Sequence, residues 1–326
     1  MIRGAAPVQQ IKMPEAPAVL TESLAVRLGS TQVLRGVDLR VERGDLYGLL
    51  GRNGAGKTTS MRAFLGLLPG SKGRCEIFGQ SANHLHRCKE AIAVALDPPG
   101  LDDTLTVRQN LELARIRGGI RSGRTVDEAL ELVGLAHRAH HRGDRLSHGQ
   151  GRRAAVARAL LGDPRLLILD EPLSGLDPEG VEVLIELFRH LSSDLGVTVV
   201  LSSHHLREVE AVCTRVGMIE AGRTILEGRV ETLLKEAGDG VRVICSQGES
   251  AEAVLGKFAG VSGVTRKEVR GQALFRARLS ADVPVAALLT KLVEAGCEVE
   301  EFVRERASLV DVFQRAVRAE TQEASA

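Results

Sequence analysis

The fold of this chain is decided by one stretch, Gly51-Arg52-Asn53-Gly54-Ala55-Gly56-Lys57-Thr58-Thr59. Residues 46–50 before it are apolar, as in a buried strand, and the residues after Lys57 follow a helical pattern that ends at Pro69-Gly70. Glycines let backbone N–H groups turn towards a phosphate, and the N-terminus of the following helix adds partial positive charge. The stretch therefore predicts a phosphate-binding loop between a strand and a helix.

Several residues of this loop are candidate nucleotide ligands: Gly51, Asn53, Gly54, Gly56, Lys57, Thr58 and Thr59. We expect Lys57 to reach the β- and γ-phosphates, and the hydroxyl of Thr58 to bind Mg²⁺.

A second segment places two carboxylates after an apolar strand, in Leu166-Leu167-Ile168-Leu169-Asp170-Glu171-Pro172. Ligand chemistry in parallel sheets gathers at the carboxyl ends of the strands. We therefore expect Asp170 to hold Mg²⁺ and Glu171 to polarise the water that attacks the γ-phosphate.

Three further segments follow a recognisable order along the chain. Leu146-Ser147-His148-Gly149-Gln150 precedes the carboxylate strand, and Ser174-Gly175-Leu176-Asp177 and Ser202-Ser203-His204 follow it. With the phosphate loop, this order resembles the ATP-binding-cassette (ABC) family, from near Leu20 to near Leu234. The resemblance implies an ATPase that uses ATP and Mg²⁺.

The segment 146–150 resembles the signature motif of that family, which normally reads LSGGQ, so His148 is a departure. The resemblance implies a head-to-tail dimer in which the signature acts in trans. Ser147 and Gly149, with His148 and Gln150, would close on the γ-phosphate held by Lys57 of the partner. A helix beginning near residues 151–153 would aim further N–H groups at that phosphate.

Two more roles follow from the resemblance. Asp177 is similar to the D-loop aspartate, which communicates across the dimer interface. His204 is similar to the switch histidine, a catalytic residue that contacts the γ-phosphate and helps hold the attacking water. We interpret the adjacent His205 as an ordinary polar neighbour.

Leu28 stands where the family usually has an aromatic ring that stacks on adenine. A leucine side chain packs against a base but has no π-face. The chain has a single tyrosine, Tyr47, inside the apolar strand before the loop, where we expect it to belong to the core.

Asp97 occupies the Q-loop position, where the family has a glutamine that senses Mg²⁺ and contacts the membrane partner. We therefore place Asp97 among the Mg²⁺ site residues, with Thr58 and Asp170. A carboxylate attracts the metal more strongly than an amide, but it also repels the phosphates, and the sequence leaves both effects open. A one-residue shift in this proline-rich loop is an alternative. Acidic residues here resemble those of antibiotic-immunity and peptide-antibiotic exporters.

Composition limits the partners that the protein is expected to have. The chain has 326 residues, enough for two domains, and a formal charge of +1. This balance and the 2% of aromatic residues argue against nucleic-acid binding. No apolar run approaches the roughly 18 residues that span a bilayer. We therefore expect a separate integral-membrane permease.

The cysteines and the N-terminus indicate location. The five cysteines are odd in number and widely spaced, which predicts free thiols in a reducing compartment. Residues 1–18 are interpreted as a flexible leader without a secretory signal. Together with the family resemblance, this predicts a peripheral protein on the cytoplasmic face of the membrane.

The expected domains are an α/β P-loop ABC ATPase domain at 19–237 and a smaller domain at 238–326. Apolar spacing from Arg108 to Leu135 predicts helices of a helical subdomain, at about residues 100–150, beside the RecA-like core. After the linker at 237–240, the pattern of strands and helices is βαββαβ, which predicts an α+β ferredoxin-like domain. This accessory domain resembles C-terminal extensions of drug-export ATPases, associated with dimer stabilisation or regulation; a purely stabilising cap is the alternative.

The sequence thus predicts the ATPase subunit of an exporter of drugs, antibiotics or peptide antibiotics, working as a homodimer. The alternative is a non-transport ABC ATPase acting on ribosomes or DNA. It is disfavoured by the single phosphate loop and by the lack of sustained heptads.

Overall fold

The computed structural model describes residues 15–269, 271–280 and 283–323. The chain divides into two compact units. The first comprises the described part of 1–45 with Gly54–Leu201 and Ala221–Arg223, and the second comprises Leu46–Asn53, Ser202–Glu220 and the described part of 224–326. Of the leader predicted at residues 1–18, residues 1–14 lie outside the described residues.

The first unit contains an antiparallel group of strands: β1 (Val19–Leu28), β2 (Thr31–Val41), β4 (Lys72–Ile77) and β5 (Gln80–Ser81). β1 pairs with β2 on one side and with β4 on the other. The turn between β1 and β2 contains Gly29, whose φ of 57° lies in the left-handed region that glycine adopts without strain.

A parallel group of strands also belongs to this unit: β6 (Ile92–Ala95), β7 (Leu166–Leu169) and the first residues of β8 (Thr198–Ser203). β7 pairs in parallel with both β6 and β8. All of β7 is buried, which explains why its sequence is a continuous apolar run rather than an alternating one. Its carboxyl end leads directly into Asp170 and Glu171.

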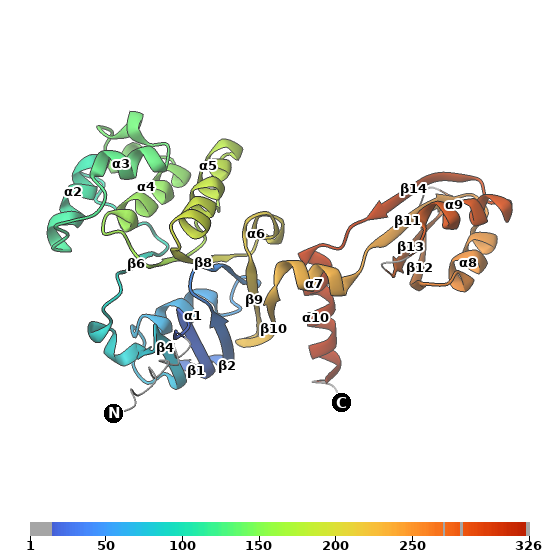
Figure 1. Cartoon of the computed structure of the whole chain (residues 1–326), viewed down its shortest axis with the longest axis horizontal. Coiled ribbons are helices and arrows are strands. Elements are labelled where there is room, and N and C mark those ends of the chain that lie inside the picture. The colour runs from blue at the N-terminus through green and yellow to red at the C-terminus, as the bar shows by residue number, and fades with distance from the viewer. Residues whose placement is uncertain (1–14, 270, 281–282, 324–326) are drawn as a thin grey trace, which may run out of the picture. The chain divides into compact units, whose positions relative to one another are not determined.

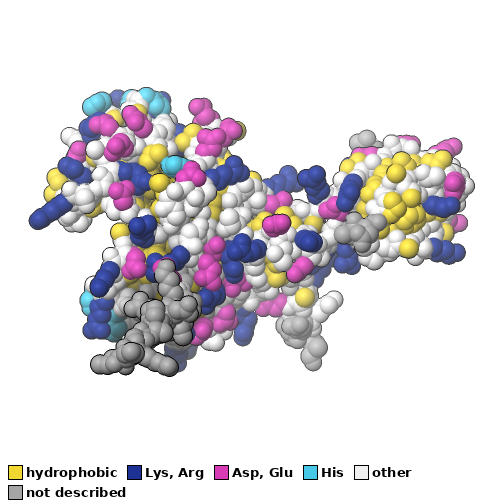
Figure 2. Space-filling model, viewed as in Figure 1, with side chains coloured by type: hydrophobic (Ala, Val, Ile, Leu, Met, Phe, Trp, Pro, Cys, Tyr) yellow, Lys and Arg dark blue, Asp and Glu magenta, His cyan; other side chains and the backbone are white. Residues whose placement is uncertain are grey.

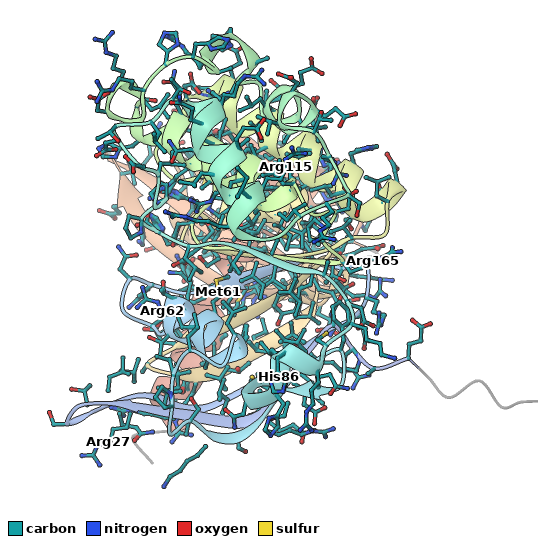
Figure 3. The ribbon with its side chains drawn as sticks, turned by 90° about the vertical axis from the view of Figure 1, so that its left-hand side faces the viewer. Arg27, Met61, Arg62, His86, Arg115 and Arg165 are labelled. Carbon is teal, nitrogen blue, oxygen red and sulfur yellow. The ribbon has the colours of Figure 1, made fainter. Side chains whose placement is uncertain are left out.

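Helix α1 (Lys57–Phe64) contacts β1, β2 and β4. Met61 is fully buried and its neighbour Arg62 is exposed. In Figure 3, Met61 lies among the packed side chains of the interior and Arg62 points outward. The apolar face of α1 therefore covers the antiparallel strands.

Three helices form a cluster in the same unit: α2 (Val107–Arg117), α3 (Val126–Leu132) and α4 (His148–Leu160), grouped together in Figure 1. Capping boxes begin α2 at Thr106 and α3 at Thr125, which satisfies N–H groups of each first turn. The cluster confirms the predicted helices, although Ile116 is 73% exposed. The unit also contains α5 (Pro178–Arg189) and the short helical segments Ala82–Arg87, Ala136–Arg138, Gly143–Arg145 and His190–Asp194.

In the second unit, β3 (Leu46–Leu50) pairs in parallel with β9 (Arg215–Glu220). Tyr47 is fully buried, as predicted, and its hydroxyl donates to the Glu227 carboxylate at 2.8 Å. β9 is followed in the sequence by β10 (Arg223–Arg229), which belongs to this unit from Thr224 onward, and α6 (Leu206–Val212) and α7 (Val230–Ala237) flank the two strands in the sequence.

The C-terminal sheet contains β11 (Gly240–Cys245), β12 (Val261–Val269), β13 (Gln272–Leu279) and β14 (Val299–Glu305), in the order β12-β13-β11-β14. All neighbouring strands are antiparallel. Helices α8 (Gly248–Lys257) and α9 (Val285–Glu294) pack against the sheet, with Phe275 fully buried in the core beneath them. This order confirms the predicted βαββαβ arrangement.

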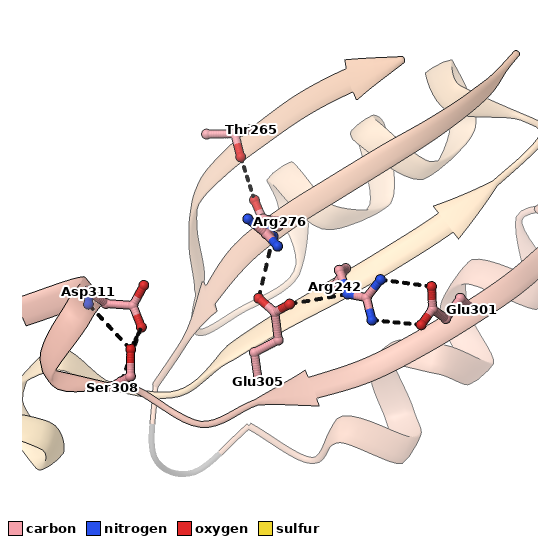
Figure 4. Close-up of polar contacts among 7 residues, drawn as sticks. All are labelled: Arg242, Thr265, Arg276, Glu301, Glu305, Ser308 and Asp311. Atoms are coloured by element: carbon pink, nitrogen blue, oxygen red, sulfur yellow. Dashed lines mark hydrogen bonds and ion pairs between the residues drawn. The ribbon is translucent and has the colours of Figure 1, made fainter. Parts of the chain in front are cut away.

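The opposite face of this sheet carries a network of ion pairs (Figure 4). Arg242 bonds both carboxylate oxygens of Glu301, at 2.7 and 2.8 Å, and contacts Glu305 at 3.1 Å. Glu305 also contacts Arg276 at 3.5 Å. Because such partly exposed pairs contribute little to stability, their main effect is to keep this face polar.

On the face shown in Figure 2, charged side chains of both signs are interspersed, in agreement with the formal charge of +1. None of the helices within the described ranges has the length and apolarity needed to cross a membrane.

All five cysteines are free thiols, as predicted, and burial raises the pKa of Cys75 to about 12.

The last helix, α10 (Leu309–Glu323), contacts α6 and α7 of its own unit. The Glu210 carboxylate on α6 accepts the backbone N–H of Leu309 at 2.6 Å, and Arg315 donates to the carbonyl of Ala237 at 2.7 Å. The first bond satisfies one of the unpaired N–H groups at the start of α10. A side chain distant in sequence thus caps this helix.

We predict that Glu210→Ala loosens the start of α10 without unfolding the chain. Loss of a capping acceptor costs about 1 kcal/mol, so amide hydrogen exchange should increase several-fold at residues 309–313. Glu236→Ala, at an exposed site on α7, is the matched control. Equal exchange in the two variants would show that Glu210 does not cap α10.

Candidate functional site

The glycine-rich loop begins after β3, with Gly51, Arg52 and Asn53 in the second unit, and continues from Gly54 in the first. Gly56 has a φ of 113°, and a Cβ there would come within 2.6 Å of the Leu34 side chain. The positive φ favours glycine at this position, and a larger residue would also displace the end of the Leu34 side chain. The loop therefore approaches β2 more closely than a chain with a side chain at residue 56 would allow.

Helix α1 begins at Lys57, directly after this glycine, which is the N-cap residue and has no side chain to cap the first turn. The start of a helix carries partial positive charge, which favours an anionic ligand at this place. Lys57 is only 7% exposed, and its Nζ lies 3.4 Å from Oε1 of Glu171. A buried cation and a carboxylate thus meet where the sequence predicts the terminal phosphates.

Thr58 and Asp170 form the second contact of this site. The Thr58 hydroxyl donates to Oδ2 of Asp170 at 2.7 Å, and Asp170 is 5% exposed. The Asp170 backbone N–H donates to the carbonyl of Ala95 on the neighbouring strand at 2.9 Å, which holds the carboxylate at the end of β7. A hydroxyl and a carboxylate side by side are oxygen donors of the kind that Mg²⁺ prefers, so these residues fit that ion.

Glu171 has a φ of 49°, in the left-handed region that non-glycine residues rarely adopt. Its carbonyl accepts the backbone N–H of Ser174 at 3.2 Å. Such backbone strain is typical of functional sites, where the surrounding structure holds a side chain in a required direction. Here that direction brings the Glu171 carboxylate to Lys57.

The signature segment 146–150 forms the start of α4. Ser147 is the N-cap: its hydroxyl accepts the N–H of Gln150 at 3.2 Å, and the Gln150 side chain accepts the N–H of Ser147 at 3.2 Å. His148 is exposed at the first helical position. A Cβ on Gly149 would lie 2.9 Å from the carbonyl oxygen of Gly175, so glycine lets α4 touch the D-loop segment.

Asp177 is the N-cap of α5. Its carboxylate accepts the backbone N–H of Gly180 at 3.0 Å, and Pro178 occupies the first turn. Aspartate at the N-cap and proline after it are both favoured there, which explains why the D-loop ends where α5 begins.

Asp97 follows β6 and is ion-paired with Arg152 of α4, at 3.2 Å. The other terminal nitrogen of Arg152 donates to the carbonyl of Ser174. Arg158 of the same helix donates to the carbonyls of Pro99 and Gly100, at 2.8 and 2.7 Å. The sequence indicated the helix near residues 151–153, but it did not identify these two arginines as binding the loop at 97–100.

His204 follows β8 in the second unit and is exposed. Its ring centroid lies 4.0 Å from that of His205, whose backbone N–H donates to the Ser203 hydroxyl at 2.9 Å. A pocket of about 260 Å³ in this unit is lined by Gly51, Arg52, Asn53, His204, Leu206 and Phe313. The sequence did not predict that Phe313 of α10 lines this pocket, because no pattern in the sequence indicates which helix α10 packs against.

Leu28, at the end of β1, is 46% exposed. Its neighbour Arg27 marks this end of the strand in Figure 3. Leu28 therefore presents an apolar side chain that is available for contact.

Comparisons with known proteins agree with this arrangement. The family model for ABC transporter matches residues 34–174. The chain is 40% identical to the bacitracin transport ATP-binding protein BcrA of Bacillus licheniformis over 212 residues, 64% of this chain and 69% of that protein. It is 35% identical to the daunorubicin resistance ATP-binding protein DrrA3 of Streptomyces coeruleorubidus over 308 residues, 91% of this chain and 94% of that protein.

A solved structure of the ATP-binding subunit of an ABC transporter superposes with a TM-score of 0.60 at 27% identity, and the match covers 67% of this chain and 92% of that chain. The family match includes Lys57, Thr58, Asp170 and Glu171. The chain therefore belongs to the ABC transporter family, as an ATP-binding protein that hydrolyses ATP.

Proposed function

We propose that this chain powers a membrane exporter, as the ATP-hydrolysing subunit beneath a separate integral-membrane permease. The observation that carries the hydrolytic part of this proposal is the pair of contacts Lys57–Glu171 and Thr58–Asp170, which collects a cation, a hydroxyl and two carboxylates within one unit. The export part is supported by the similarity to BcrA and DrrA3. These are the groups that phosphoryl transfer to water requires.

In this proposal, each side chain of the phosphate site has one task. Lys57 binds the β- and γ-phosphates, with help from the N–H groups of the loop 51–59. Thr58 and Asp170 hold Mg²⁺, which when bound neutralises phosphate charge. Glu171 takes a proton from the attacking water. Its contact with Lys57 places it within reach of the phosphate that Lys57 binds.

The signature completes the site in trans, which makes the protein a homodimer. Ser147, His148, Gly149 and Gln150 of one protomer would meet the nucleotide of its partner, and the exposure of Ser147 and His148 supports this role. Asp177, also exposed, would carry information across the interface, and His204 would contact the γ-phosphate. ATP then stabilises the closed dimer, and hydrolysis reopens it.

The proposed domain boundaries are 19–237 for the ATPase domain and 238–326 for the accessory domain, with a helical subdomain at about 100–150. The names of the relatives BcrA and DrrA3 concern bacitracin and daunorubicin. We therefore propose an antibiotic or drug as the exported substrate, and a peripheral location on the cytoplasmic face of the membrane.

Thr58→Val should weaken Mg²⁺-dependent ATP binding by about 10-fold or more, because it removes a charge-assisted hydrogen bond and an oxygen ligand. Thr58→Ser keeps the hydroxyl and is the matched control. Titration of a fluorescent ATP analogue, with and without Mg²⁺, measures the effect. If Thr58→Val retains the full Mg²⁺ effect, Thr58 is not a ligand.

Leu28→Tyr should tighten ATP binding about 5-fold or more, because stacking of a base on an aromatic ring is worth about 1–3 kcal/mol. Leu67→Tyr, at a site that is 58% exposed, controls for the addition of a tyrosine elsewhere. Competition with tripolyphosphate, which lacks a base, separates adenine contacts from phosphate contacts. Equal gains for ATP and tripolyphosphate would refute the assignment of Leu28.

Glu171→Gln should abolish turnover and trap an ATP-bound dimer, because the amide keeps the shape of the side chain but cannot accept the proton. Size-exclusion chromatography with and without ATP measures the trapping. Glu179→Gln, on the exposed first turn of α5, is the control. Normal hydrolysis by Glu171→Gln would exclude Glu171 as the base.

The same trapped variant tests the export proposal. Tagged Glu171→Gln protein, purified with ATP from gently solubilised native membranes, should bring a polytopic membrane protein with it. Recovery of ribosomal or nucleic-acid-binding partners alone would overturn export but leave the ATPase mechanism intact.

A further inference from the structure

Three segments far apart in the sequence meet at the side chain of Arg152. One terminal nitrogen lies 3.2 Å from Oδ1 of Asp97, 55 residues away, and the other donates to the carbonyl of Ser174, 22 residues away. The side chain of Arg152 is 20% exposed and that of Asp97 is 47% exposed, so the contact with Ser174 is the better shielded of the two. The planar guanidinium suits this geometry, because its donors diverge from one rigid group.

Two features of the surroundings make the Ser174 contact a close one. Gly175 has a φ of 72°, and a Cβ there would lie 3.6 Å from Arg152. Gly149, one turn before Arg152 on α4, lies so close to the Gly175 carbonyl that a Cβ there would come within 2.9 Å of its oxygen. Residues three apart share one face of a helix, so the face of α4 that binds Ser174 through Arg152 also approaches the segment closely at Gly149.

The Asp97 contact has similar support. Arg158, farther along α4, binds the carbonyls of Pro99 and Gly100, so the loop 97–100 is also held twice. Asp97, Arg152 and Asp170 line one small cavity of about 10 Å³. Arg152 is therefore near both the carboxylate that it binds at Asp97 and the end of β7, where Asp170 lies.

We propose that Arg152 is a positioning residue that clamps the loop of Asp97 to the segment 174–177, so that the two move as one body. The charge pair also explains how a carboxylate is accommodated at residue 97: Arg152 neutralises it. Asp97 then serves as the anchor of the clamp. The kinetic consequences of this inference rest on the proposed function, in which the residues of the phosphate site hydrolyse ATP.

The consequence for function is a direct link between the surface that would contact the permease and the surface that would form the dimer interface. The resemblance places the loop of Asp97 against the permease and the segment ending at Asp177 at the dimer interface. A displacement of the first would be passed to the second through the guanidinium of Arg152, which binds both.

The first test is amide hydrogen exchange on the full chain without nucleotide. Arg152→Gln should increase exchange at residues 174–177 by about 10-fold, since a hydrogen bond from a charged donor is lost. Asp97→Asn should increase exchange at the same residues by a smaller factor, although Asp97 does not touch them. Arg108→Gln, which breaks the ion pair with Asp127 in the same helical cluster, is the control. Unchanged exchange at 174–177 in both clamp variants would overturn the inference.

The second test separates a clamp from simple charge neutralisation. Arg152→Lys keeps the positive charge but has no fork to bind two acceptors at once. Under the clamp, its kcat should fall nearly as far as that of Arg152→Gln, about 10-fold, while KM for ATP changes less than about 2-fold. Wild-type kcat in Arg152→Lys would refute the clamp.

A double-mutant cycle of Asp97→Asn and Arg152→Gln completes the design, with non-additivity in kcat of about 2-fold or more expected for residues in contact. Additive effects would contradict the coupling.

The exchange measurement requires no ATP turnover. If exchange responds as expected but the wild-type protein hydrolyses no ATP, the clamp stands and the proposed function fails.

Discussion

The contact between Lys57 and Glu171 is the interaction on which the rest of the site depends. Lys57 is almost completely buried, and a buried cation is costly unless a partner of opposite charge lies close to it. That requirement fixes the start of α1 relative to the end of β7. The residue that meets the lysine, Glu171, also has the left-handed backbone that is typical of functional sites.

Close approach of backbone segments is the second constraint. Gly56 lets the phosphate loop lie against Leu34, and Gly149 lets α4 lie against the carbonyl of Gly175. Any Cβ at these two positions would collide with its neighbour, so the glycines serve packing as much as ligand binding. Helix α4 therefore combines three tasks: its N-terminus carries the signature, its glycine approaches the D-loop, and its arginines bind the loop at 97–100.

The C-terminal region is more than a sheet with two helices. Its last helix returns to α6, where Glu210 caps it, and Phe313 lines the pocket that also contains His204. Helix α6, which begins two residues after His204, is thus in contact with α10. A motion of the accessory region has a physical path to this segment within the same unit.

The sequence alone determined the family and the fold class, and it identified the phosphate loop, the carboxylate strand and the βαββαβ pattern. These features are local: a glycine spacing, an apolar run or a periodicity is complete within a few neighbouring residues. Only the tertiary structure decided that Arg152 binds Asp97 and Ser174, that Glu210 caps α10, and that Phe313 reaches the pocket of His204. Each of these contacts joins residues far apart in the chain. The residues next to an arginine, a glutamate or a phenylalanine in the sequence do not indicate which distant residue it will contact. Packing of the elements, rather than their sequence, brings such side chains together.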